Sequence, residues 1–261
     1  MQLNGKIEMT FVKNIFQVTG KKLSIIQYLC LIYSMFFIFN NGVEIQQLFL
    51  IIAGYFLFGG IGFSMMLHRY FTHRSFEFRS KLLYYIFEFI SIISLRGSVI
   101  GWVYVHRKHH RNTDTEHDPH SPRYNKWKVF FPSYMKYDTG FNKFIVKDLL
   151  NGRQIFINNF YFLIILVWSL ILIGIDTELF LYLYLIPISI LHVILMFFIY
   201  FGHSDEKNDI MVNDNLFFGI LLFGEGWHKN HHNDPQEHRF VSDKMNIDII
   251  DWLIRLVKIN D

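Results

Sequence analysis

The chain has 261 residues, of which 52% are apolar and 18% aromatic, and its mean hydropathy is positive. A soluble chain of this length would form one or two domains, but this composition favours a membrane protein with several spans. The net charge of +3 at pH 7 and the lack of a dense run of Lys and Arg argue against a nucleic-acid-binding protein. Cys30 is the only cysteine, so an intramolecular disulfide cannot form.

Four apolar runs predict membrane-spanning helices. The segment 82–105 is also apolar on average, but it contains Glu88 and Arg96. A charge at the centre of a lipid-exposed helix costs about 2.5–3.5 kcal/mol, so we predict that this segment lies along the membrane interface or half-buried against other helices. The polar start, Met1 to Gly20, is not typical of a cleavable signal peptide. The predicted spans are 23–39, 48–67, 161–175 and 179–201.

These elements predict an all-α fold in which an integral membrane four-helix bundle carries a helical cap, with residues 1–261 forming a single domain. The two loops on the far side, 40–47 and 176–178, contain no Lys or Arg. All 25 basic residues then lie on the near side with both termini, which the positive-inside rule makes cytoplasmic. The membrane is a bacterial inner membrane or the endoplasmic reticulum. Apolar residues at helical spacing from Ile247 to Val257 predict an amphipathic helix on membrane or protein.

Eight of the thirteen histidines lie in three short clusters, each after an apolar run. In a helix, positions i, i+3 and i+4 share one face, so the two clusters with His-x2-His-His spacing can each converge. Neutral imidazole is a ligand for Fe, Zn, Cu or Ni. Eight such ligands exceed the octahedral limit of one ion, so the count favours two ions without naming the metal. The clusters are His68 and His73; His106, His109 and His110; and His228, His231 and His232.

Residues next to the histidines extend the pattern. Gly62 and Phe63 precede the first cluster, and Trp102 lies four residues before the second. The second cluster leads to Asp118-Pro119-His120-Ser121, and the third follows Gly224-Glu225-Gly226-Trp227. With these motifs the chain resembles, over roughly residues 20 to 240, the membrane fatty-acid desaturases, specifically the acyl-chain Δ9 type that includes stearoyl-CoA desaturase.

The resemblance implies a chemistry and a ninth ligand. Members of that family bind two iron ions, activate dioxygen and remove two hydrogens from an acyl chain to leave a cis double bond. A histidine at the inner end of the fourth span completes their nine-imidazole site, and His203 holds that position here. Their electrons come from cytochrome b5 or ferredoxin through a reductase. Since no cytochrome b5 haem segment is recognisable in this chain, we expect a separate electron donor.

Two positions depart from the family pattern. Many members have an Asn four residues before the fourth-span histidine, where it holds a water on one metal, and this chain has Ile199. CoA-using members have Arg-Asp just before the second cluster, and this chain has Tyr104-Val105. The substrate class therefore stays open between acyl-CoA, acyl-lipid and acyl-carrier protein.

Further residues are candidates for supporting roles. Asp118 and Glu225 could orient ligand imidazoles through their second nitrogen, although Glu225 could equally belong to a glycine-flanked turn. His120 is a supporting residue or a solvated loop histidine. Trp102 and Trp227 line an acyl tunnel or act as interfacial anchors. His192 lies eleven residues before His203, about 16 Å along a helix, which predicts a packed or tunnel-lining residue.

Two alternative functions remain beside the desaturase hypothesis. A membrane di-iron hydroxylase or monooxygenase of lipids or hydrocarbons would use the same ligands, because the same chemistry can end in oxygen insertion. A non-enzymatic metal-binding or metal-transport membrane protein would need ligating residues along its spans, where His192 and Cys30 are the obvious candidates. For the clusters themselves the alternatives are chance or a structural zinc site, and for His203 a histidine at a helix end.

Overall fold

The described part of the chain is helical in this computed structural model. It comprises residues 20–119, 121–123, 127–130, 142–203, 212–241 and 247–259. Within those ranges the structure has no β-strand, only the isolated bridges Phe78–Lys258 and His203–Val212. The all-α prediction is confirmed.

Four helical stretches among the described residues are long and apolar enough to cross a membrane, which makes the protein an integral membrane protein. Two of them extend further towards the cap than the sequence predicts. The second does not stop at residue 67 but winds on to His73, and the third begins at Gly152, where the Asn151 side chain caps its first turn. The stretches are α2 (Lys21–Asn41), α3 with η1 (Ile45–Tyr55 and Phe56–His73), α7 (Gly152–Ile175), and η3 with α8 (Leu179–Leu185 and Ile186–Gly202).

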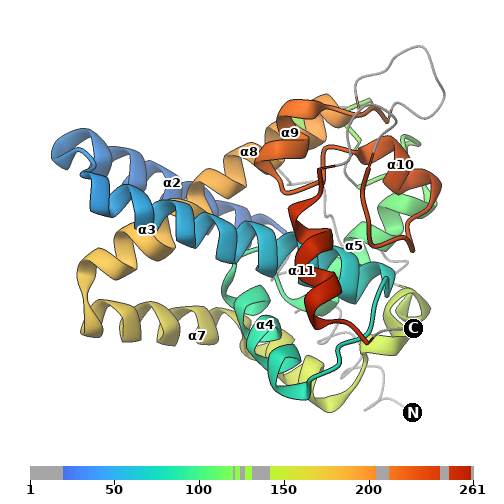
Figure 1. Cartoon of the computed structure of the whole chain (residues 1–261), viewed down its shortest axis with the longest axis horizontal. Helices are drawn as coiled ribbons and strands as arrows, with labels where there is room; N and C mark the ends of the chain where they lie inside the picture. The colour runs from blue at the N-terminus through green and yellow to red at the C-terminus, as the bar shows by residue number, and fades with distance from the viewer. Residues whose placement is uncertain are drawn as a thin grey trace.

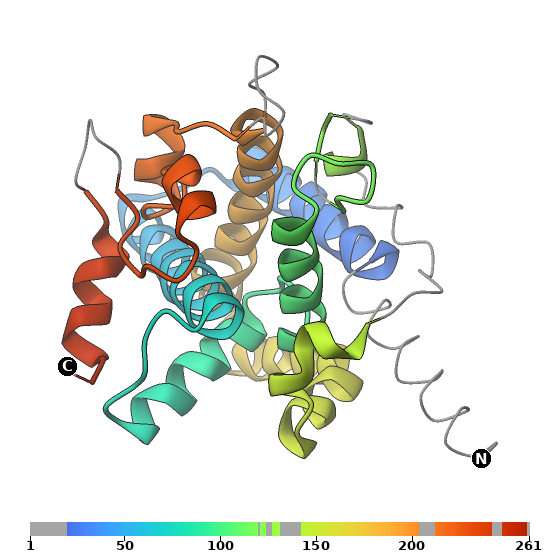
Figure 2. The same cartoon turned by 90° about the vertical axis from the view of Figure 1, so that its right-hand side faces the viewer.

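The long helices project to one side, and the shorter cap helices gather at the opposite end (Figures 1 and 2). The second and fourth spans are central: in their most apolar 18-residue stretches 56% and 61% of the residues are buried, against 22% in each outer span. At Gly54 the two central spans touch so closely that a Cβ would lie 2.0 Å from the Leu183 carbonyl oxygen. The outer helices instead expose apolar side chains such as Phe36 and Leu166, as lipid contact requires.

The segment 82–105 forms two helices, α4 (Lys81–Ile93) and α5 (Val99–Arg111). Glu88 of α4 is fully buried, more deeply than we predicted. Burial is possible because its carboxylate accepts hydrogen bonds from Tyr84 (2.9 Å) and Gln154 (2.6 Å) and pairs with Arg153. Residues 94–98 form the turn that connects the two helices.

The remaining described helices build the cap. The predicted helix is confirmed as α11 (Ile249–Val257), which buries Ile250, Ile254 and Val257 on one face, whereas the apolar residues Trp252 and Leu256 are exposed. It packs against η1, whose end carries the first histidine cluster. The other cap helices are α6 (Trp127–Phe130), η2 (Lys143–Leu149), α9 (Leu216–Leu221) and α10 (His228–Asn233).

Candidate metal centre

The structure brings all nine predicted histidines together in two groups. Within each group, one ring nitrogen from every histidine lies within 4.8 Å of the others. Four different elements contribute, and they are far apart in the sequence. The first group, set A, contains His68, His73, His106, His110 and His231, and the second, set B, contains His109, His203, His228 and His232.

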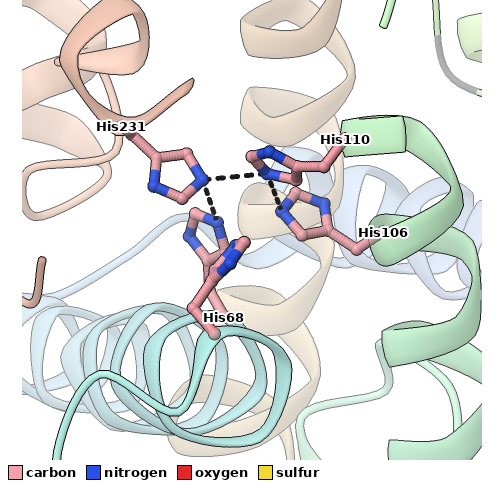
Figure 3. Close-up of side chains that lie close together, drawn as sticks. His68, His106, His110 and His231 are labelled. Carbon is pink, nitrogen blue, oxygen red and sulfur yellow. Dashed lines mark hydrogen bonds between the residues drawn. The ribbon is translucent and has the colours of Figure 1, made fainter. Parts of the chain in front are cut away.

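The Nε2 atoms of set A point towards a common centre, as the four rings labelled in Figure 3 show. The His231 Nε2 lies 3.0 Å from those of His68 and His110, and the His110 Nε2 lies 3.1 Å from that of His106. The Nε2 of His73 is buried and has no hydrogen-bond partner among the described residues. Set A is thus a pocket of nitrogen lone pairs that these residues do not fully satisfy.

Set B repeats this arrangement beside it. The His228 and His203 Nε2 atoms are 3.0 Å apart, and those of His109 and His232 are 3.3 Å apart. His203 follows the last residue of α8, the position expected for the ninth ligand.

Helical phase divides each three-histidine cluster between the two sets. In α5, His106 and His110 are one turn apart and serve set A, whereas His109 serves set B. The third cluster is reversed, since His228 and His232 serve set B and His231 serves set A. The three histidines of each cluster lie on one side of their helix, as predicted, but their rings divide between two neighbouring centres.

The first cluster depends on a different winding. In an α-helix, residues five apart point in different directions, but in η1 the backbone has π-type i to i+5 hydrogen bonding, which aligns them. The His68 and His73 rings are therefore only 5.0 Å apart. The Thr72 hydroxyl follows the same repeat, donating to the Leu67 carbonyl at 2.8 Å. A π-helical turn thus explains the His-x4-His spacing.

The geometry of both sets fits a metal ion. With a metal–nitrogen bond of about 2.1 Å, adjacent ligand atoms of an octahedral ion are about 3.0 Å apart, which matches the spacings above. Burial, together with the neighbouring histidines, lowers the pKa of His106, His228, His231 and His232 well below the usual value. These imidazoles are therefore neutral at pH 7, the form that binds metals.

Carboxylates hold the opposite nitrogens of three rings. Glu225 lies against the His68 Nδ1, and the His109 Nδ1 donates to Asp118 at 2.9 Å, as predicted for both acids. The His203 Nδ1 donates to Asp114 at 3.1 Å, a contact that sequence reasoning missed. Its position four residues before Asp118, in the same loop, is a signal that could have found it. Such carboxylates fix the tautomer and orientation of a metal-bound ring.

Glu225 belongs to a buried network behind set A. Ser64 donates to it, and the Arg69 guanidinium donates to Ser64 and to Asp248, both at 3.0 Å. Burial by itself raises the pKa of the Glu225 carboxyl, but His68, Arg69 and Ser64 outweigh burial and hold that pKa below its usual value. The carboxylate is therefore ionised beside His68.

Comparison with known proteins decides the family. Residues 46–243, most of the chain, match the family model described as fatty acid desaturase. The chain belongs to the fatty acid desaturase family. The two histidine sets are consistent with the di-iron site typical of this family.

Curated relatives of this chain differ in their named specificity. A probable chloroplastic lipid desaturase of Arabidopsis thaliana is 29% identical over 76% of this chain, which spans only 58% of that relative's length. Delta-9 acyl-lipid desaturase 1 of the same plant is 28% identical, over 77% of this chain and 69% of the relative's own length. An acyl-CoA C20 Delta5-desaturase of Anemone leveillei is also 28% identical, over 79% of this chain and 69% of the relative's own length.

A cavity of about 130 Å³ runs from the two histidine sets between α2, α5 and α8. Trp102 lines it and stacks on His106 with ring centroids 4.8 Å apart, and His192 lines it as predicted. Ile199 presents an apolar side chain to the same space as His203. Of the CoA-related pair, Val105 lines the cavity, and Tyr104 is buried in the core.

Two predicted supporting residues have other outcomes. Trp227 is not among the residues that line this cavity: it is buried against Gly219, and its indole donates to the Ile247 carbonyl at 3.1 Å, so it braces the loop before α10. His120 lies outside the described residues, so the prediction for it is not tested.

A second, polar pocket opens on the other side of the histidines. It is lined by His110 of set A, His232 of set B and the exposed basic residues Arg111 and Lys229. Both histidine sets therefore border the outer polar pocket as well as the cavity, but through different rings, since His110 and His232 do not line the cavity.

Proposed function

We propose that this desaturase introduces a cis double bond into a saturated acyl chain at two iron ions. The observation that carries the proposal is the pair of converging histidine sets at the wall of a cavity whose exposed surface is mostly apolar. In this assignment all nine histidines are metal ligands, five for one ion and four for the other.

The protein and the metal have separate tasks in this proposal. Protein side chains cannot themselves break an unactivated C–H bond, so bound iron would supply dioxygen activation and oxidising power. The overall reaction consumes one dioxygen and two electrons with two protons, and yields the alkene and two waters. The residues of this chain hold the rings, as Glu225, Asp118 and Asp114 do, and exclude bulk water from the acyl chain.

The substrate assignment rests on the cavity and the relatives. An acyl substrate is implied by the family, and we propose a Δ9 acyl-lipid specificity, supported by the relative named Delta-9 acyl-lipid desaturase 1. The relative named as a Delta5-desaturase makes the bond position the quantity to measure. Val105 and Tyr104, in place of Arg-Asp, favour a lipid over a CoA ester.

We further propose that the electrons come from a separate redox protein, a ferredoxin or cytochrome b5. The polar pocket lined by His110 and His232 supports this, because an acidic donor would approach both sets there, between Arg111 and Lys229. In this arrangement the cap faces the cytoplasm and residues 1–261 work as one domain. Product formation by purified protein with NAD(P)H alone would contradict a separate donor.

Expression in a host that lacks its own desaturase, followed by mass analysis of the lipids, tests the activity. We expect acyl chains lighter by two hydrogens, with the double bond located by fragmentation. A product heavier by one oxygen would make the protein a hydroxylase. Unchanged lipids, in cells where the protein carries two irons and a reduced donor is present, would contradict the assignment.

A further inference from the structure

The feature that the proposed chemistry leaves unexplained is a buried arginine in the cavity wall. Arg96 lies in the turn between α4 and α5, and only 6% of it is exposed. Its Nη1 lies 3.5 Å from the His192 Nδ1, and its Nε and Nη2 have no hydrogen-bond partner among the described residues. The His192 Nε2 also has none. Both side chains line the cavity that reaches the histidine sets.

The surroundings of Arg96 supply no counter-ion. Gln27 of α2 lines the same part of the cavity, but its amide donates to the Leu95 carbonyl at 2.6 Å. The Tyr161 hydroxyl accepts from the Gly97 amide at 3.0 Å. Within the described residues no carboxylate oxygen lies within 4.0 Å of Arg96. Burial lowers the pKa of Arg96 only to about 10, so the guanidinium remains charged at pH 7.

A buried cation without a partner is costly, and its free donors call for acceptor oxygens. The methyl end of an acyl chain offers none, whereas the other end carries a carbonyl or a carboxylate. We propose, building on the desaturase function above, that Arg96 and His192 hold the oxygen-bearing end of the acyl substrate, either an ester carbonyl or a free carboxylate. Arg96 would donate to that oxygen with the N–H groups that have no other partner.

This anchor would also select the carbon that reacts. Arg96 comes just before α5, and His106 is seven residues beyond Val99, the first residue of that helix, or about 10 Å along its axis. An acyl oxygen fixed at Arg96 therefore places methylenes at a set distance along the chain beside the histidines. Arg96 is in this sense a positioning residue for the site of the double bond.

Binding of three probes to the purified full chain in detergent tests the anchor: methyl stearate, stearate and octadecane. We expect the wild type to bind at least one oxygen-bearing probe more tightly than octadecane, and the stronger of the two tells an ester from a carboxylate. Hydrogen bonds to charged groups predict that Arg96→Met weakens this binding by about 10- to 100-fold and leaves octadecane binding unchanged. Arg255→Met, which removes an exposed arginine on α11, should keep the wild-type preference.

Any other binding result would contradict the proposal that Arg96 anchors the acyl substrate. Equal binding of octadecane and both oxygen-bearing probes by the wild type does so even if Arg96→Met fails to fold. An unchanged preference in Arg96→Met, or in the milder Arg96→Gln, does so as well.

Product analysis separates this inference from the proposed function. If the wild type forms double bonds, Arg96→Gln should form them at more than one position, and a single unchanged position would contradict the anchor alone. If the wild type carries iron and has a reduced donor but forms no double bond, the desaturase assignment itself fails.

Discussion

Sets A and B use the same side chain but are built differently. Set A has five imidazoles, two of them on a π-helical span, and is supported by the buried network of Glu225, Ser64, Arg69 and Asp248. Set B has four imidazoles, and its two supporting carboxylates, Asp114 and Asp118, lie in one loop. The backbone amide of Asp114 donates a hydrogen bond to the Asp118 carboxylate at 2.8 Å. Set A thus has two of its five histidines on a membrane-spanning helix, whereas set B has only His203, directly after α8. The other histidines of both sets lie on α5 and α10. The difference teaches that the two centres can be perturbed separately.

The largest effect is expected from two adjacent residues of α10. His231→Ala removes a ligand from set A and His232→Ala removes one from set B, so both should abolish product formation. Iron analysis with Mössbauer spectroscopy should show loss of a different ion in each variant. Loss of the same ion in both would show that the sets are not separate sites. His117→Ala, at an exposed histidine, is the control and should keep both ions.

The carboxylates offer a milder comparison. Glu225→Gln and Asp118→Asn keep the shape of the side chain but weaken the orientation of His68 and His109. Each should lower metal affinity or activity about 10- to 100-fold, measured by metal titration and turnover. Because Glu225 belongs to a network with Ser64, Arg69 and Asp248, we expect the larger loss there. Wild-type affinity in either variant would contradict the supporting role of that acid.

Acid should destabilise the metal-free protein through both sets. The pKa values of His106, His228 and His231 are lowered by burial in the folded protein, so the unfolded chain binds more protons below about pH 6.5. The free energy of unfolding therefore falls as pH falls. Thermal unfolding after chelation should show a lower Tm at about pH 5.5 than at about pH 7.5. The difference should shrink equally in His228→Ala and His231→Ala, and a flat profile would contradict the burial of neutral imidazoles.

The smallest effect is expected outside both sets. Asp148 accepts from Arg74, after η1, and from Arg107 of α5, and these arginines lower its pKa to about 2 against the opposing effect of burial. Asp148 is 39% exposed, so solvent screens the pair. Asp148→Asn should cost at most about 1 kcal/mol of stability and leave iron content unchanged. A loss of iron would show that this link positions the histidines.

Much of the architecture could be predicted because its signals are local. The four spans follow from apolar runs, and the resemblance to the family was evident from the spacing of the eight clustered histidines and the residues beside them. The division of these histidines into sets A and B was not predicted. It depends on the phase of α5 against α10, a tertiary relation that no single segment encodes.

Other features of the site and fold that were not predicted from the sequence have similar physical causes. The π-type winding that aligns His68 with His73 is not specified by any residue pattern that we could recognise. Asp114 became a partner of His203 only because the loop after α5 folds back onto the end of α8. The burial of Glu88 depends on Arg153 and Gln154, more than sixty residues later in the chain.

The helices α5 and α10 each serve both sets, and this sharing has a consequence for assembly. When either helix packs so that its histidines complete one set, its remaining histidines are placed in the other set as well. The first ion captured therefore prepares the place of the second, and stepwise addition of Fe²⁺ to the stripped protein should produce doubly occupied molecules alongside empty ones, with few that hold a single ion.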